Sequence, residues 1–201
     1  MSRNTRDLLM ETATGLVRRQ GYSAFSYADL SDVVGIRKAS IHHHFPSKED
    51  LGEAVVDSYT ASFSEKLDQI HKEASDPLEQ LQRYAELYRE GLGRKEACLC
   101  GVLASEIAVL PDRVQKGVRR FMSVNLDWLE KTLEDDSDAR LRPDIQPRRD
   151  ARTVLSALQG ALIIGLSTRD PAAFDETVEG LLNGLRSPER RPARARRRRQ
   201  H

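Results

Sequence analysis

Apolar residues recur along most of this chain at the three- and four-residue spacing of an α-helix. The clearest series lies in residues 47–71, where Leu51, Val55, Tyr59, Phe63 and Leu67 follow one another at intervals of four. Such a series predicts one long helix with an apolar stripe on one face. Because Leu, Ala, Glu and Arg, all good helix formers, dominate the composition, we expect an all-α protein.

The same spacing predicts further helices on both sides of this segment. Gly21 is a natural C-terminal cap for the first helix, and Gly91 and Gly93 interrupt the chain after another. A polar stretch at residues 134–147 is expected to form a loop. The expected helices cover about residues 4–20, 76–92, 97–110, 111–133, 148–168 and 171–185.

Residues 26–51 have a different pattern, that of two short helices around a glycine turn. Ser26 with Asp29, and Ser47 with Asp50, each form the S-x-x-D pattern of a helix start. Gly35 lies between the two short helices, and the second carries mostly polar side chains. This arrangement is typical of a helix-turn-helix, whose second helix enters the major groove of DNA.

The segment RDLLMETATGLVRRQGYSAFSYADLSDVVGIRKASIHHHFPSKEDL, from Arg6 to Leu51, resembles the DNA-binding domain of TetR/AcrR-family transcriptional regulators. Gly21-Tyr22 after the first helix, Gly35 in the turn and FPSK before the long helix stand in the family's register. The resemblance implies an N-terminal helix-turn-helix head joined to a helical ligand-binding and dimerisation body. We expect the head at residues 1–50, the body at 51–185 and a disordered Arg-rich tail at 186–201.

The resemblance also implies which residues contact DNA. Members of the family usually carry Ser or Thr where this chain has Arg37, and Tyr where it has His42, so the second short helix lacks its usual N-cap. Loss of an N-cap costs about 0.5–2 kcal/mol. Lys48 matches a phosphate contact of the family. The expected DNA-binding residues are Tyr27, Arg37, Lys38, Ala39, Ser40, His42, His43 and Lys48.

Charge and composition narrow the classes of function. The net charge is +1, but residues 186–201 hold eight Arg and one Glu, whereas residues 51–185 carry −7. DNA affinity must therefore come from a few placed residues, with or without help from the tail. Successive helical residues point about 100° apart, so the run His42-His43-His44 is not expected to bind a metal. We expect no catalytic residues, no cofactor and no enzymatic activity.

The expected location is the cytoplasm. The N-terminal segment MSRNTRDLL does not have the pattern of a signal peptide, and the apolar stretch 154–166 is shorter than the roughly 20 residues that span a bilayer. Two cysteines do not make a disulfide framework. We therefore expect no membrane partner.

Cys98 and Cys100 lie within the CLCG segment and leave two interpretations open. They could be small apolar core residues, or Cys98 could sense oxidants or electrophiles, with Cys100 as a weaker candidate. Arg94, Lys95 and the start of a helix would favour the thiolate of Cys98. The CLCG segment also resembles that of family members that respond to such compounds.

The body is expected to hold a pocket for a small, mostly neutral and apolar ligand. Asn125 and Glu106 stand among apolar residues, either as satisfied core groups or as ligand contacts. The expected ligand-binding residues are Tyr84, Tyr88, Val102, Glu106, Phe121, Asn125 and Trp128.

The last two expected helices offer more apolar surface than one chain needs, which indicates a two-fold four-helix interface. Its expected residues are Leu155, Leu158, Ala161, Leu162, Leu166, Leu181, Leu182 and Leu185. An intrachain core is the alternative use of this surface.

These patterns together predict a homodimeric repressor that binds double-stranded DNA at a palindromic operator. Release would follow binding of a small apolar inducer, or modification of a cysteine by an oxidant or electrophile. The alternative is a DNA-independent helical protein that binds small molecules or acts as a scaffold.

Overall fold

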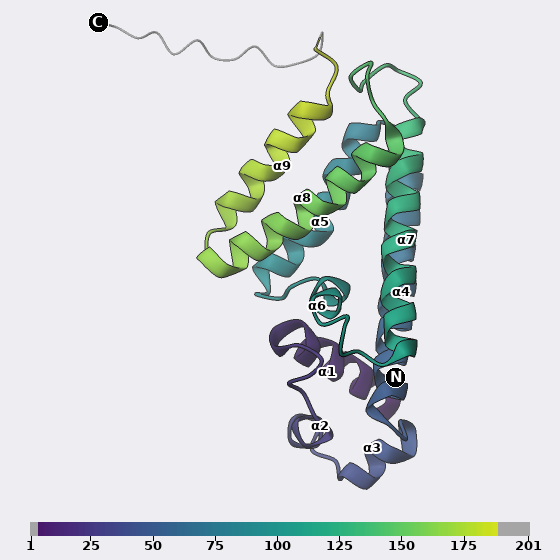
Figure 1. Ribbon diagram of the computed structural model, residues 1–201, viewed down its shortest axis with the longest axis vertical. Helices are drawn as coiled ribbons and strands as arrows, with labels where there is room; N and C mark the ends of the chain where they lie inside the picture. Colours follow the sequence, from purple (N-terminus) through teal and green to yellow (C-terminus); the bar gives the residue numbers. More distant parts are fainter. Residues whose placement is uncertain (1–3, 189–201) are drawn as a thin grey trace, which may run out of the picture.

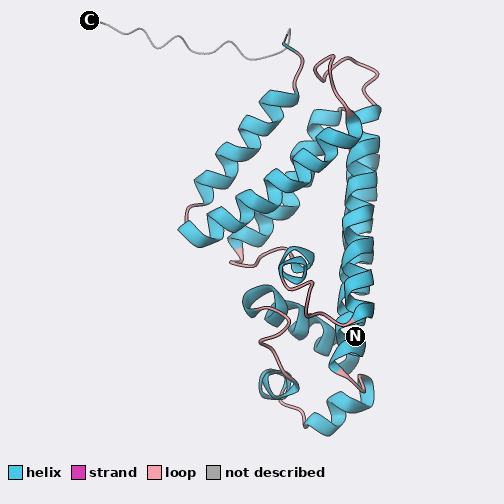
Figure 2. Ribbon diagram, viewed as in Figure 1, coloured by secondary structure: helices cyan, strands magenta, loops and turns pink. Residues whose placement is uncertain are grey.

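The chain folds into helices joined by short links, as a computed structural model shows for residues 4–188 (Figures 1 and 2). Residues 189–201, which make up most of the predicted Arg-rich tail, lie outside the described residues. Within residues 4–188 the helices are α1 (Thr5–Gln20), α2 (Tyr27–Val34), α3 (Lys38–His44), α4 (Lys48–Glu73), α5 (Pro77–Gly93), α6 (Leu99–Ser105), α7 (Asp112–Glu134), α8 (Pro147–Thr168) and α9 (Pro171–Leu185). The all-α prediction is confirmed.

The helices form two parts that share α4. Helices α1, α2 and α3 gather at one end of the molecule, at the bottom of Figure 1, and α4 runs from them along α7 into the body. Helices α5, α8 and α9 lie beside this pair, and α6 sits between α1 and the body. A displacement of α4 or α6 would therefore reach both parts.

Local sequence signals set the ends of the head helices. Ser26 and Ser47 each form a complete capping box, with Asp29 and Asp50 respectively. Gly35 ends α2 with a left-handed φ of 74°, which a residue with a Cβ adopts only at a cost. At the N-cap of α3, the Arg37 side chain makes no capping bond, as expected from the replacement of the usual Ser or Thr.

Helix α6 is shorter than the predicted 97–110. It spans Leu99–Ser105, because the backbone on either side makes other bonds. The Ala97 carbonyl accepts a hydrogen bond of 2.7 Å from Arg18 Nε, and Cys98 is extended. Beyond Ser105, the amides of Glu106, Ile107 and Val109 form i→i+3 bonds typical of a tightened turn.

One continuous core runs through both parts. In the head it includes Leu9, Leu30, Ile41 and Leu51, none of them exposed. Helix α8 is the one helix among the described residues whose length and composition would suit a membrane span. Its buried face includes Val154, Leu158 and Leu162 and packs against α7 and α9, so a place in the core accounts for these three residues.

Candidate nucleic-acid interface

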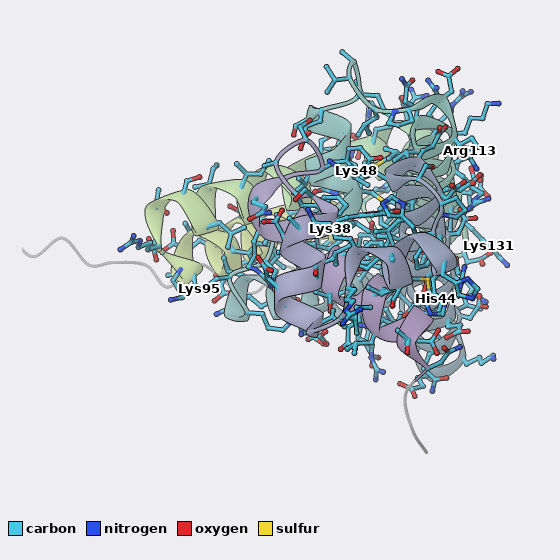
Figure 3. All side chains as sticks on the ribbon, turned by 90° about the horizontal axis from the view of Figure 1, so that it is seen from below. Lys38, His44, Lys48, Lys95, Arg113 and Lys131 are labelled. Carbon is cyan, nitrogen blue, oxygen red and sulfur yellow. The ribbon has the colours of Figure 1, made fainter. Side chains whose placement is uncertain are left out.

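Helix α3 is fixed to the head by one side chain and exposes most of the others. Ile41 is fully buried, and the helix is followed by Phe45, which is also buried. All six residues predicted for DNA contact on and before this helix are exposed: Arg37, Lys38, Ala39, Ser40, His42 and His43. Figure 3 looks at this end of the molecule and shows Lys38 there. A polar outer face on a short anchored helix has the shape that major-groove recognition requires.

The side chains of Tyr27 and Lys48, both expected to contact DNA, are half-buried and make contacts within the head. The Tyr27 hydroxyl lies 2.9 Å from the Phe45 carbonyl oxygen and 2.6 Å from that of Ser47, to either of which it can donate. Burial raises the pKa of Tyr27 to about 12, so the residue stays neutral. Lys48 Nζ lies 4.5 Å from the ring centres of both Tyr22 and Phe25, a cation–π arrangement.

A shallow hollow of about 540 Å³ opens between α2 and α3. Lys38, His42 and Lys48 line it together with Ser26 at the start of α2. His42 is also held in place, because its Nδ1 lies 3.1 Å from the Pro46 carbonyl oxygen. Basic side chains beside a helix N-terminus suit a phosphate group.

The histidine run is spread over the outside of α3. The His42 ring packs on Tyr27 with centres 4.9 Å apart, whereas the His43 and His44 rings contact each other at 5.5 Å. Within the described part of the chain, no three His, Cys, Asp or Glu side chains are grouped as a metal would require.

A carboxylate from the body holds the link between α1 and α2. Glu106 Oε1 accepts 2.8 Å from the Tyr22 amide, Oε2 accepts 2.8 Å from the Ser23 amide, and the Ser23 hydroxyl donates to the same carboxylate. Gly21 stands directly beside it with φ 91°, and a Cβ there would collide with Glu106. The turn that leads into the helix-turn-helix is therefore bound to the end of α6.

A salt bridge reinforces this junction. Arg18, near the end of α1, lies 2.7 Å from Glu96 and also donates to the Ala97 carbonyl. Both side chains are more than four-fifths shielded from solvent, so this pair is less screened than a surface pair. The sequence carried no sign of the roles of Arg18, Glu96 and Ser23, since nothing local relates residues about 80 positions apart.

Similarity to known proteins shows which family this chain belongs to. The family model for bacterial regulatory proteins of the tetR family matches residues 9–55. A TetR-family transcriptional regulator from Agrobacterium tumefaciens has the same fold, with 37% identity, a TM-score of 0.87, and coverage of 90% of this chain and 97% of that one. The chain belongs to the TetR family. It is a transcriptional regulator.

Other TetR-family proteins are similar over nearly their whole length. The transcriptional repressor DhaR of Mycobacterium sp. strain GP1 is 26% identical over 90% of this chain and 91% of its own. A TetR regulator of known structure from Legionella pneumophila is 27% identical with a TM-score of 0.85, and the alignment covers 92% of this chain and all of that one. The similarity thus includes the body as well as the helix-turn-helix head.

The predicted ligand residues do not form one open pocket in this TetR-family body. Tyr84, Tyr88, Phe121 and Asn125 are each at most 3% exposed and are packed together. Asn125 accepts 2.7 Å from the Tyr84 hydroxyl and donates to the Phe121 carbonyl, so it is a satisfied core group. Trp128 stacks on Tyr84. Val102 and Glu106 instead line a separate cavity beside α1.

The two cysteines are buried and differ in their surroundings. Cys98 is the N-cap of α6 rather than part of its first turn, and its Sγ lies 3.9 Å from the Tyr59 hydroxyl. Cys100 is fully buried, and burial, with a smaller contribution from Cys98, raises the pKa of its thiol well above the ordinary value. A raised pKa makes Cys100 the poorer nucleophile.

The predicted dimer face requires a correction. Leu155, Leu158, Ala161, Leu162 and Leu185 are each at most 7% exposed within a single chain, so they belong to the intrachain core. Leu166, Leu181 and Leu182 are half-buried. The exposed apolar residues of α8 are Ile163 and Ile164, at 59% and 53%. Periodicity alone did not show that the stripe with Leu155, Leu158 and Leu162 faces the other helices of the chain while Ile163 and Ile164 face outward.

Replacing Glu106 by Gln should weaken the junction. Burial alone would raise the pKa of Glu106, but hydrogen bonds from Ser23 and the Tyr22 amide, aided by Lys48, hold it below its usual value. A group with a lowered folded-state pKa stabilises the fold above its unfolded pKa and loses this contribution as pH falls. We expect Glu106→Gln to lower the free energy of unfolding by about 1–3 kcal/mol at pH 7.

The measurement is urea unfolding of both proteins from pH 7 to pH 3. The difference between them should hold at neutral pH and shrink below about pH 4, where the wild-type carboxylate takes up a proton. Glu65→Gln, an exposed acid on α4, serves as the control and should have little effect. A Glu106→Gln protein as stable as wild type at pH 7 would contradict the role assigned to this carboxylate.

Proposed function

We propose that this TetR-family regulator is a cytoplasmic repressor that binds a palindromic operator as a homodimer. The observation that carries the proposal is the exposed polar face of α3, which comprises Lys38, Ser40, His42 and His43 with Arg37 before it, above the buried anchor Ile41. Side chains of these types read base edges or contact phosphates. The basic hollow at Lys38, His42 and Lys48 would hold one phosphate and orient the helix.

The dimer would form through α8 and α9. Ile163 and Ile164 are more than half exposed on α8. Helix α9 adds the half-buried Leu181 and Leu182. An exposed apolar surface of this kind supports association with a second copy. Two-fold pairing would then place two α3 helices on successive half-sites, about 34–36 Å apart or a multiple of that spacing.

Release from DNA would act through α6. The N-cap of this helix is Cys98, which contacts Tyr59 on α4, and the residue after its last turn is Glu106, which holds the head. A ligand or a covalent change at α6 would therefore alter two contacts that position the head. It shifts the protein toward release only if it favours the released conformation over the DNA-bound one.

Lys38→Ala should weaken operator binding without affecting the fold, because the side chain is exposed on the outer face of α3. We expect a loss of roughly 5- to 100-fold in affinity. If Lys38 contacts a phosphate, the slope of log affinity against log salt should also fall by about 1. Fluorescence anisotropy with a duplex that the protein selects from a random pool measures both quantities.

Lys72→Ala is the matched control, since Lys72 is an exposed lysine on the last turn of α4, at the end away from the head. Its affinity should equal that of wild type. Equal binding by wild type and Lys38→Ala, at all salt concentrations, would refute the assigned contact.

Ile164→Glu should convert the dimer into a monomer. The substitution would place a carboxylate from each copy in the apolar interface, and the cost of burial and like charge should raise the dimer Kd roughly 100-fold or more. Sedimentation equilibrium measures this constant. Val109→Glu, at a residue 69% exposed on the link to α7, should leave the dimer intact. A dimer that persists in Ile164→Glu would show that this face is not the interface.

Cys98→Ser tests whether the thiol is the sensor. N-ethylmaleimide reacts by adding the sulfur across its carbon–carbon double bond, and the thiol proton ends on the neighbouring carbon. We expect the reagent to release wild type and Cys100→Ser from DNA but not Cys98→Ser, because burial disfavours the thiolate of Cys100. Release of Cys98→Ser at the wild-type rate would exclude Cys98 as the sensor.

A further inference from the structure

A cavity of about 1030 Å³ lies where the head meets the body. Its walls come from the end of α1, the end of α5, α6, and the turn between α8 and α9, and it opens to solvent. Leu92, Ala97, Val102 and Leu166 supply an apolar surface. The cavity is therefore distinct from the aromatic cluster around Tyr84.

Basic residues dominate the charged groups of this cavity. Arg18, Arg19, Arg89, Lys95 and Arg169 line it, against the single carboxylate of Glu106. The first three have acidic partners. Arg18 and Arg19 share Glu96, at 2.7 and 3.4 Å, and Arg89 pairs with Asp175 at 2.7 Å.

Two positive charges remain without a partner. Neither Lys95 nor Arg169, both exposed, forms an ion pair with any residue in the described range 4–188. Glu106, the only acid on the cavity wall, is already bound to the amides of Tyr22 and Ser23. The cavity thus combines an apolar wall with two free cations.

Lys95 and Arg169 also share an unusual backbone conformation. Lys95 and Arg169 each have φ of 57°, and within residues 4–188 only Ala139 among other non-glycine residues also has a positive φ. The left-handed region costs a residue with a Cβ roughly 1–2 kcal/mol. Asparagine or glycine would relieve this cost, yet the chain has a long cationic side chain at both positions. Arg169 is the C-cap of α8 and Lys95 follows the C-cap of α5, so the end of a helix accounts for both conformations.

We propose that this cavity binds a small organic anion with an apolar body. The anionic group would lie between Lys95 and Arg169, and the apolar part would cover Leu92, Val102 and Leu166. This differs from the neutral, apolar ligand expected from the sequence, because the cations come from the links between helices rather than from the faces of the middle helices. The binding site rests on the apolar wall and the two cations of the cavity and does not depend on the proposed function.

Such an anion would also act on the junction with the head. Arg18, Gly21 and Glu106 are part of the cavity wall, so a bound negative charge would compete with Glu96 for Arg18 and repel Glu106. Both effects loosen the contacts that hold the turn after α1. This regulatory consequence, unlike the binding site, rests on the proposed function as a DNA-binding repressor.

The test is calorimetric titration of the full-length protein, without DNA, with octanoate and with benzoate. The neutral probes are 1-octanol and benzyl alcohol, which share the apolar bodies. We expect each carboxylate to bind at least about 10-fold more tightly than its alcohol. Lys95→Asn and Arg169→Asn remove the charges but tolerate the left-handed backbone, and each should weaken carboxylate binding about 3- to 10-fold.

Lys131→Gln is the control, an exposed lysine on α7 at the opposite side of the molecule from Lys95 (Figure 3). It should bind the carboxylates as wild type does. Arg169→Lys, which restores a positive charge, should recover most of the affinity lost in Arg169→Asn and so separates charge from folding. Equal affinity for carboxylate and alcohol, or wild-type affinity in both Asn variants, would overturn the proposal.

A second measurement separates the site from its regulatory role. Operator binding is measured with and without saturating octanoate. A lower operator affinity with octanoate, absent in Lys95→Asn, supports the regulatory role. Carboxylate binding with unchanged operator affinity supports the site and overturns that role. Failure to bind DNA without any anion counts against the proposed repressor function and leaves the calorimetric test of the cavity unaffected.

Discussion

The arrangement of head and body depends on one carboxylate, that of Glu106, which accepts hydrogen bonds from the backbone amides of Tyr22 and Ser23. These amides lie in the turn after α1, where Gly21 has a positive φ and leaves no room for a side chain. Without Glu106 the two amides would lack their partner in the fold. The carboxylate therefore stabilises the turn and also fixes the position of α2 and α3 relative to α6.

This junction places the elements that we propose to respond to a ligand or a thiol reagent next to the head. Cys98 is the N-cap of α6 and Glu106 is its C-cap, so the two residues stand about 12 Å apart at 1.5 Å of rise per residue. The basic cavity shares Arg18 and Glu106 with the same junction. In the proposed mechanism, a small ligand would change the position of the head directly, without a rearrangement of the aromatic core.

In contrast to the junction at α6, the aromatic core is closely packed and rigid. Phe63 contacts the rings of Tyr84, Tyr88 and Phe121 with centres 5.2–6.2 Å apart. The rings of the two tyrosines lie 5.4 Å apart, and their hydroxyls bond to each other. Closely packed aromatic pairs with satisfied polar atoms form a rigid unit. We infer that this cluster gives α4, α5 and α7 a fixed frame, against which α6 and the head can shift.

Local sequence signals were sufficient to predict much of this protein. The S-x-x-D patterns at Ser26 and Ser47, the turn at Gly35 and the four-residue spacing on α4 predicted where these helices form, because caps and periodicity act between residues close in sequence. The resemblance to the family, rather than these signals, indicated the DNA-contact residues of α3 and the missing N-cap at Arg37. Only the tertiary structure decided the partners of Glu106, the burial of Leu158 rather than Ile164, and the pairing of Arg18 with Glu96. It also brought Lys95 and Arg169 to one cavity. Burial and charge pairing depend on which helix faces pack together, and this packing is decided by contacts between residues tens of positions apart.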